Sequence, residues 1–255
     1  MAPERLGDWL RREPFALTMS SGFFGFFAHA GVLRALERAE LAPSAVSGSS
    51  AGALVTGLWA AGLGAEAIEE ELMRLERDHF WDPSPGLGLL RGKRFGEKLE
   101  ELLPVTRFEE CRVPAAISVF DVLSRQTRVM REGDLAPAIR ASCTLPVLFQ
   151  PMWHRGRPLL DGGILDRPGL AGMEHQRLLY HHLASKSPWR RHGSEALQVP
   201  QRDGLCALVI EDLQRVNPFR LERGRRAFRQ AEDATSRALE RPVSAGGVRI
   251  SASAR

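Results

Sequence analysis

The composition of the chain is that of a globular protein and excludes several functional classes. Of its 255 residues, 44% are hydrophobic and 26% are charged, which suffices for one large domain or two small ones with a sizeable core. The net charge is +4, but no basic stripe is interleaved with aromatic residues, so nucleic acid is disfavoured as a partner. The three cysteines are far apart in the sequence and suggest neither a disulfide framework nor a zinc site.

The sequence also carries signals about location. No run of eighteen apolar residues predicts a transmembrane helix, and the N-terminal residues include acidic side chains and no long apolar core. Arginines crowd the last third of the chain, which fits either an ordinary solvated surface or attraction to anionic lipid head groups. We expect a cytoplasmic protein without metal or cofactor, with peripheral contact to a membrane as an option. The oligomeric state is not predicted.

In chain order, the predicted elements begin with strand, helix, strand and helix, which is the order of a parallel α/β unit. Short apolar runs bounded by turns predict strands, and apolar residues spaced three and four apart predict helices. Strands are expected at residues 15–20, 44–47, 113–121, 126–130, 159–164 and 207–210. Helices are expected at residues 29–39, 51–63, 65–77, 95–103, 138–146 and 218–239. Because parallel strands need crossovers of this kind, the pattern indicates an α/β fold, a three-layer α/β/α arrangement with a mainly parallel central sheet.

The most informative stretch is Gly48-Ser49-Ser50-Ala51-Gly52, which has the Gly-x-Ser-x-Gly spacing of a nucleophile elbow. In such an elbow a strand turns sharply into a helix, and the glycines leave room where side chains would collide with neighbouring backbone. Ser50 is therefore the candidate nucleophile, at a helix N-terminus whose dipole favours developing negative charge. The alternative is that Ser47 or Ser49 caps the helix without any catalysis.

A serine nucleophile needs a base within hydrogen-bond reach, and Asp161 is the candidate with the better setting. It comes at the end of a predicted strand, directly before Gly162 and Gly163, so an open backbone lies beside its carboxylate. The pKa of an aspartate in water is about 3.9, so Asp161 can act as a base only in a partly desolvated site that raises its proton affinity. The alternatives are a structural turn aspartate and a histidine base from the set His175, His181, His182 and His192.

Four blocks of the sequence resemble the patatin-like phospholipases, serine acyl hydrolases with a Ser/Asp dyad and no histidine. The blocks are residues 20–36, 48–53, 138–151 and 161–163, in the order that the family has them. The resemblance implies that Ser50 is the nucleophile and Asp161 the base. It also implies an oxyanion hole formed by the backbone N–H groups of Gly22, Phe23 and Ala51.

The loop at Gly22 departs from the family's pattern. Members carry a run of glycines and then a basic residue, whereas Ser21, Phe23 and Gly25 stand here at the first glycine, third glycine and basic positions. A phenylalanine still offers its N–H, but its side chain restricts positive φ, so we expect a different path for the loop. Phe23, Phe24 and Phe26 are also candidates for the wall of an acyl-chain pocket, with core packing as the alternative.

The sequence also predicts a division of the chain, although the resemblance itself spans only residues 15 to about 170. Residues 1–14 are expected to be an amphipathic lead-in, residues 15–240 the catalytic domain, and residues 241–255, rich in glycine, serine and alanine, a disordered tail. Within the domain, residues 174–204 have little periodicity, so a surface loop with an interrupted helix is expected there.

Together these features predict a serine esterase that cleaves fatty acyl esters of phospholipids or neutral lipids through an acyl-enzyme. Its partner would be a lipid or acyl ester substrate. Three alternatives stay open: an α/β-hydrolase esterase with a histidine from residues 175–192, a catalytically weak membrane-associated or scaffold protein, and acyl transfer to an alcohol other than water.

Overall fold

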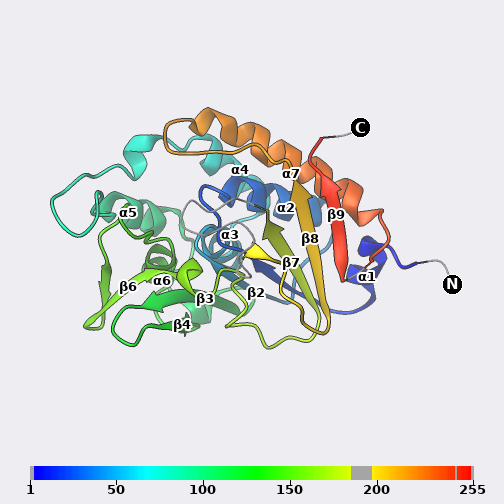
Figure 1. Ribbon diagram of the computed structural model, residues 1–255, viewed down its shortest axis with the longest axis horizontal. Coiled ribbons are helices and arrows are strands. Elements are labelled where there is room, and N and C mark those ends of the chain that lie inside the picture. The colour runs from blue at the N-terminus through cyan, green and yellow to red at the C-terminus, as the bar shows by residue number, and fades with distance from the viewer. Residues whose placement is uncertain (1–2, 185–196, 245, 254–255) are drawn as a thin grey trace.

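The computed structural model describes residues 3–184, 197–244 and 246–253, and shows a central sheet flanked by helices (Figure 1). The α-helices are α1 (Leu6–Arg12), α2 (Phe26–Arg38), α3 (Ala51–Ala60), α4 (Ala65–Met73), α5 (Lys93–Leu102), α6 (Leu135–Ser142) and α7 (Gly224–Leu239). The strands are β1 (Ala16–Met19), β2 (Ala45–Ser49), β3 (Ala115–Asp121), β4 (Gln126–Met130), β5 (Met152–His154), β6 (Arg157–Asp161), β7 (Leu178–Leu183), β8 (Leu205–Glu211) and β9 (Gly247–Ser251). Short 3₁₀ helices are η1 (Arg77–His79), η2 (Phe108–Glu110), η3 (Gly162–Ile164) and η5 (Leu221–Arg223).

The described strands form one sheet in the order β5-β6-β3-β2-β1-β7-β8-β9, with β4 paired to β3 outside this path. The neighbours from β3 through β2, β1, β7 and β8 to β9 are parallel. The pairs that involve β4, β5 or β6 are antiparallel. The expected α/β fold with a mainly parallel central sheet is therefore confirmed.

The two faces of the sheet are covered differently, because side chains along a strand point alternately to opposite faces. One face sends side chains such as Leu17 and Leu179 into the main core, where they meet the buried residues of α1 to α7. Figure 1 shows α2 and α7 lying together along the sheet. The other face sends Ala16 and Leu178 into a smaller cluster, which Met173 covers from a loop. The parallel strands thus lie between a helical layer and, in the described residues, loop segments.

Two segments have more structure than the sequence analysis expected. Residues 178–183, expected to be surface loop, form the buried strand β7 between β1 and β8. A strand buried on both faces has no polar alternation, so the period that identifies an amphipathic strand is missing there. Residues 247–251, expected to be part of a disordered tail, form the edge strand β9 against β8. The glycine- and serine-rich composition of this segment does not reveal the partner strand that orders it.

Candidate active site

The turn between β2 and α3 has the geometry of a nucleophile elbow. Ser50 has φ 53° and ψ −117°, a conformation that residues with a side chain seldom adopt. A Cβ atom on Gly48 would collide with the backbone of Gly52, and one on Gly52 would collide with the backbone of Met19. Glycine is therefore required on both sides of the serine, which agrees with the spacing in the sequence.

Strands β2 and β6 meet end to end along one edge of β3, whose other edge pairs with β4. On the shared edge, Ser49 of β2 pairs with Ser118, and Asp161 of β6 pairs with Val119, the next residue of β3. Because β2 runs parallel to β3 and β6 runs antiparallel to it, the carboxyl ends of β2 and β6 point toward each other. This topology brings together Ser50 and Asp161, which are 111 residues apart in the sequence.

The two side chains are joined by a hydrogen bond. Ser50 Oγ donates to Asp161 Oδ2 over 2.6 Å, and the Gly163 N–H donates to Asp161 Oδ1 over 2.8 Å. Ser50 is half-buried, whereas Asp161 is only 3% exposed. Burial is the main influence on the carboxyl group and raises the pKa of Asp161 to about 6, against the opposing effect of the two hydrogen bonds. Asp161 is thus a better proton acceptor than an aspartate in water and is still ionised at neutral pH.

Two residues that the sequence analysis did not single out hold the elbow in place. The Ser50 N–H donates to Ser142 Oγ over 2.9 Å, and that hydroxyl donates to the Ser118 carbonyl over 2.7 Å. Cys143 Sγ donates to the Ser50 carbonyl oxygen over 3.3 Å. Both residues belong to a sequence block that was recognised as a whole. Their individual contacts depend on how α6 packs against β3, which no local pattern reveals.

The loop after β1 lies against the residues that surround the carboxylate. A Cβ atom on Gly163 would collide with the side chain of Ser21, so the loop and the turn after β6 are in close contact. Among the described residues, none accepts a hydrogen bond from the N–H of Gly22 or of Phe23. Ala51 is the first residue of α3, and its N–H has no acceptor within the helix. These three N–H groups are the expected oxyanion donors.

The phenylalanines of this loop divide into one exposed and two partly buried rings. The altered backbone path was expected at Phe23, but the residue with a positive φ, of 53°, is Phe24. Phe24 and Phe26 are partly buried and pack against the main core, with ring centroids 5.3 Å apart. Phe23 is 51% exposed, and its ring centroid lies 4.9 Å from that of Phe24. Core packing thus accounts for part of this aromatic cluster, and a role in binding an acyl chain stays a prediction.

The candidate histidines that the structure describes form no hydrogen bond with the serine. His181 and His182 are buried in β7, and His181 Nδ1 lies 2.8 Å from Nδ1 of His29. His175 is exposed, and His192 lies outside the described residues. In the part of the chain that the structure describes, the candidate nucleophile has its side-chain hydrogen bond with an aspartate and not with a histidine.

The His29–His181 pair is neutral and lies behind the loop. His29 Nε2 donates to the Ser20 carbonyl over 2.7 Å, which leaves His29 Nδ1 as the acceptor for the N–H of His181. Burial lowers the pKa of His29 to about 3 and lowers the pKa of His181 well below its usual value. The pair therefore holds the first carbonyl group of the loop without adding charge to the site.

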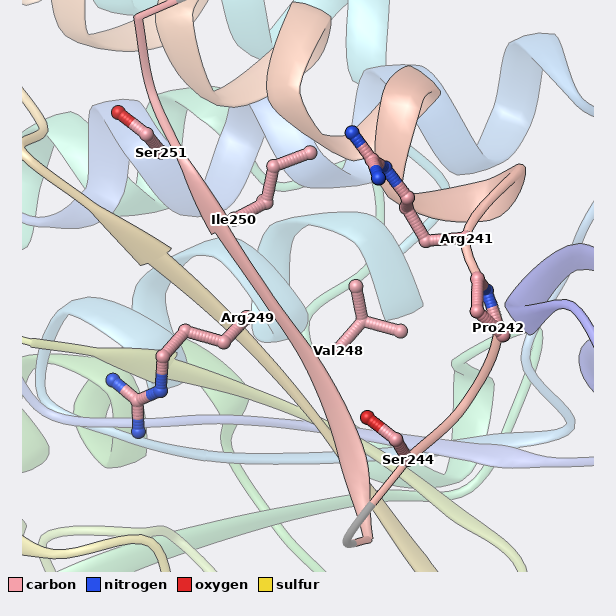
Figure 2. A pocket seen from close by; sticks show the side chains of 7 residues that line it. All are labelled: Arg241, Pro242, Ser244, Val248, Arg249, Ile250 and Ser251. Atoms are coloured by element: carbon pink, nitrogen blue, oxygen red, sulfur yellow. The ribbon is translucent and has the colours of Figure 1, made fainter.

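Away from the Ser50–Asp161 pair, a shallow hollow lies beside β9 (Figure 2). The side chains that line it come from β9 and from the segment after α7, and are Arg241, Pro242, Ser244, Val248, Arg249, Ile250 and Ser251. None of these described side chains is a carboxylate, histidine or cysteine. Over the described residues as a whole, no group of three or more His, Cys, Asp or Glu side chains is placed to hold a metal ion.

None of the helices in residues 3–184, 197–244 and 246–253 combines the length and the apolar character that crossing a membrane requires.

Comparisons with known proteins agree on one family and one fold. The family model for the patatin-like phospholipases matches residues 17–171. An uncharacterized NTE family protein of Mycobacterium bovis is 32% identical over 154 residues, which are 59% of this chain and 43% of that protein. Lysophospholipase NTE1 of Scheffersomyces stipitis is 26% identical over 183 residues, which are 69% of this chain and 12% of that protein. The crystal structure of VipD from Legionella pneumophila aligns with a TM-score of 0.63 at 16% identity, covering 89% of this chain and 67% of that one.

The chain thus spans less than half the length of these curated relatives. The structural likeness to VipD concerns the fold, since the two sequences share few residues.

Proposed function

The chain belongs to the patatin-like phospholipase family, and on this premise we propose that it is a serine acyl hydrolase that cleaves fatty acyl esters of phospholipids or neutral lipids. The observation that carries the proposal is the hydrogen bond between Ser50 and Asp161 at the meeting point of β2 and β6. The family supports a lipid ester as the substrate class, and one relative carries the name lysophospholipase. We assign Ser50 as the nucleophile and Asp161 as the general base.

In the proposed first half-reaction, Asp161 Oδ2 takes the proton of Ser50 Oγ while this oxygen attacks the ester carbonyl carbon. The carbonyl oxygen becomes negative and accepts hydrogen bonds from backbone N–H groups, for which those of Gly22, Phe23 and Ala51 are the candidates. The bond between the carbonyl carbon and the alcohol oxygen then breaks, and Asp161 returns its proton to the departing alcohol. The acyl group stays on Ser50 as an ester.

In the second half-reaction, Asp161 takes a proton from a water molecule, whose oxygen attacks the acyl carbon. The bond to Ser50 Oγ breaks, the serine recovers the proton from Asp161, and the fatty acid leaves. The raised pKa of Asp161 supports this role, because a base is most effective when its pKa lies close to the working pH. A carboxylate with a pKa of about 6 is still ionised at neutral pH but accepts a proton more readily than one in water.

The proposal is tested with a short nitrophenyl ester and with a fluorophosphonate probe. We expect the parent protein to hydrolyse the ester and to be labelled on Ser50, and the Ser50→Ala variant to do neither. The matched control is Ser49→Ala, which removes a hydroxyl one residue away that is fully buried and has no hydrogen-bond partner among the described residues. Labelling of Ser50→Ala, or an unreactive parent protein, contradicts the assignment.

A further inference from the structure

Six large apolar side chains are exposed on loops and turns that follow or contact the segments carrying the Ser50–Asp161 pair. Their exposed fractions range from half to most of the side chain, and we call this set the apolar rim: Phe23 (51%), Leu87 (85%), Leu89 (50%), Val147 (66%), Leu165 (55%) and Phe219 (70%). Single exposed apolar residues are common, but contiguous apolar patches on a soluble monomer are rare and mark contact with a partner or a membrane. The six side chains mark such a contact only if they form one connected patch.

Three members of the rim lie in segments that converge on the pair. Phe23 is next to the proposed oxyanion donor Gly22. Val147 follows closely after Thr144, whose carbonyl oxygen accepts the N–H of Asp161 over 2.9 Å. Leu165 directly follows η3, the 3₁₀ helix that begins after the same aspartate. Three separate parts of the chain thus each place one exposed apolar side chain beside the site.

The other two leucines are joined to this group through Val147. The Leu89 N–H donates to the Val147 carbonyl over 3.0 Å, and the neighbouring Leu90 N–H donates to the Leu148 carbonyl over 2.8 Å. These bonds hold the loop that carries Leu87 against the segment after α6. The loop projects from the same side of the molecule as α5 in Figure 1, where it is drawn in cyan.

A chain of aromatic contacts joins Phe219 to Phe23. The ring of Phe219 lies 6.0 Å from that of Trp81. The ring of Phe80, the residue before Trp81, lies 5.9 Å from that of Phe24, which in turn lies 4.9 Å from Phe23. The rim is therefore connected from the loop before α7 to the loop after β1.

Basic side chains without carboxylate partners accompany the rim. Arg91 and Arg220 are exposed, the first close to Leu89 and the second next to Phe219. Neither forms an ion pair with any residue that the structure describes. No acidic residue occurs in the stretch 83–96, which also contains Arg94 and Lys93, although Lys93 forms an ion pair with Glu97 over 3.1 Å. The charge around the apolar side chains is thus complementary to an anionic surface.

We propose that the apolar rim, together with Arg91 and Arg220, docks the protein on an anionic lipid membrane, with Ser50 facing the acyl esters of the outer lipid layer. Leucine and aromatic side chains enter the boundary between head groups and acyl chains, and arginines beside them bind lipid phosphates. The proposal rests on the proposed function, since it takes the membrane as the source of the substrate. A protein partner for the same surface is the competing outcome of the test.

Binding is measured by sedimentation with vesicles of equal parts phosphatidylcholine and phosphatidylglycerol, using protein that carries Ser50→Ala so that no lipid is consumed. Adding Leu87→Ser and Phe219→Ser should lower the partition coefficient at least about tenfold, because two exposed apolar side chains lose their burial in the membrane. Replacing Arg91 and Arg220 with glutamine should cost about fivefold for each arginine on these vesicles, and nothing on pure phosphatidylcholine.

The matched control is the pair Leu123→Ser and Trp153→Ser. These residues are 63% and 69% exposed, but they lie on the turn after β3 and on β5, and no hydrogen bond or aromatic ring contact among the described residues joins them to the rim. Binding should be unchanged in this control. The proposal is overturned if the rim variant binds as well as the parent protein, or if the rim and control variants lose binding equally. It is also overturned if the parent protein does not bind vesicles at all, and a protein partner would then be the occupant of this surface.

Hydrolysis of a short, water-soluble nitrophenyl ester separates this proposal from the proposed function. With Ser50 intact, the rim variant should hydrolyse this ester at the parent rate but lose activity on vesicles. A parent protein inactive on the ester that nevertheless binds vesicles through the rim would refute the function and retain the docking surface. If the parent protein is active on the ester but its activity on vesicles does not depend on the rim, the docking surface is refuted and the function is retained.

Discussion

Two aspartates close together in the chain, Asp161 and Asp166, are both nearly buried but differ in what occupies their oxygen atoms. The carboxylate of Asp166 accepts four hydrogen bonds, one from the Ser118 hydroxyl over 2.6 Å and three from the backbone N–H groups of residues 169–171. The carboxylate of Asp161 accepts one from a backbone N–H and one from a serine hydroxyl. Three backbone N–H groups and the buried hydroxyl of Ser118 surround Asp166, whereas the serine that donates to Asp161 is only half-buried.

Asp166 supports the structure of the elbow, whereas Asp161 is placed to take part in the reaction there. By ordering residues 169–171, Asp166 places the Gly169 carbonyl where it accepts the Ser47 hydroxyl over 2.7 Å. A Cβ atom on Gly169 would lie 2.9 Å from Gly48 Cα, so this loop packs directly behind the elbow. Asp161 contacts the elbow from the side on which Ser50 is exposed. A buried carboxylate thus acts as scaffold where backbone donors fill it and is available as a base where they do not.

The largest expected effect is the loss of turnover in Asp161→Asn. An amide cannot accept the serine proton, so kcat/KM on a short nitrophenyl ester should fall about 100- to 10,000-fold. The melting temperature should stay the same or rise, because the variant no longer buries a carboxylate whose folded-state pKa is raised. Ester hydrolysis and thermal unfolding measure the two effects. Retained activity would show that Asp161, like Asp166, supports the structure and does not act as the base.

The reverse pattern is expected for Asp166→Asn. The amide nitrogen cannot accept the hydrogen bonds from Ser118 and Ala171, so the free energy of unfolding should fall by about 2–3 kcal/mol. Urea unfolding measures this loss, and the rate per folded molecule should fall far less than in Asp161→Asn. If stability is unchanged and turnover alone collapses, the division between the two aspartates is wrong.

The pH dependence of activity sharpens the assignment of the base. Asp161 must be ionised to act, and its pKa is raised to about 6, so kcat/KM should fall about tenfold between pH 7 and pH 5. Stability should respond in the opposite direction. Between the unfolded value of 3.8 and about 6 the folded state binds the proton more tightly, so the contribution of Asp161 to stability is lost as the pH rises through this window. A comparison with Asp161→Asn isolates both effects, and an activity profile that is flat from pH 7 to pH 5 would exclude Asp161 as the base.

The smallest expected effect is that of Ser142→Ala, which leaves the N–H of Ser50 without its acceptor. A buried hydrogen bond of this kind contributes about 1 kcal/mol, so we expect kcat to fall about fivefold as the elbow loosens. Ser49→Ala is the control, since its buried hydroxyl has no partner among the described residues. Equal rates in the two variants would show that Ser142 does not position the nucleophile.

The sequence alone determined the features that depend on neighbouring residues. Gly48 is required by a backbone collision within the turn, so the elbow could be identified from its spacing, although the collision that requires Gly52 is with Met19 of strand β1. The hairpin strand at residues 126–130 was predicted with its observed bounds, because its apolar run and turn are local. The four recognised blocks also identified the family and predicted Ser50 and Asp161 as the reacting pair.

Only the tertiary structure decided how those parts meet. The strand β7 has no local signal, because its place between β1 and β8 and the packing against both of its faces are properties of the whole sheet and not of residues 178–183. The contact between Ser50 and Asp161 depends on two strands that share one edge of β3, and the raised pKa of the carboxylate depends on burial that this packing creates. Steric limits on the backbone act between neighbours and are encoded in spacing, whereas burial and the number of hydrogen-bond donors around a group arise from segments that are distant in the sequence.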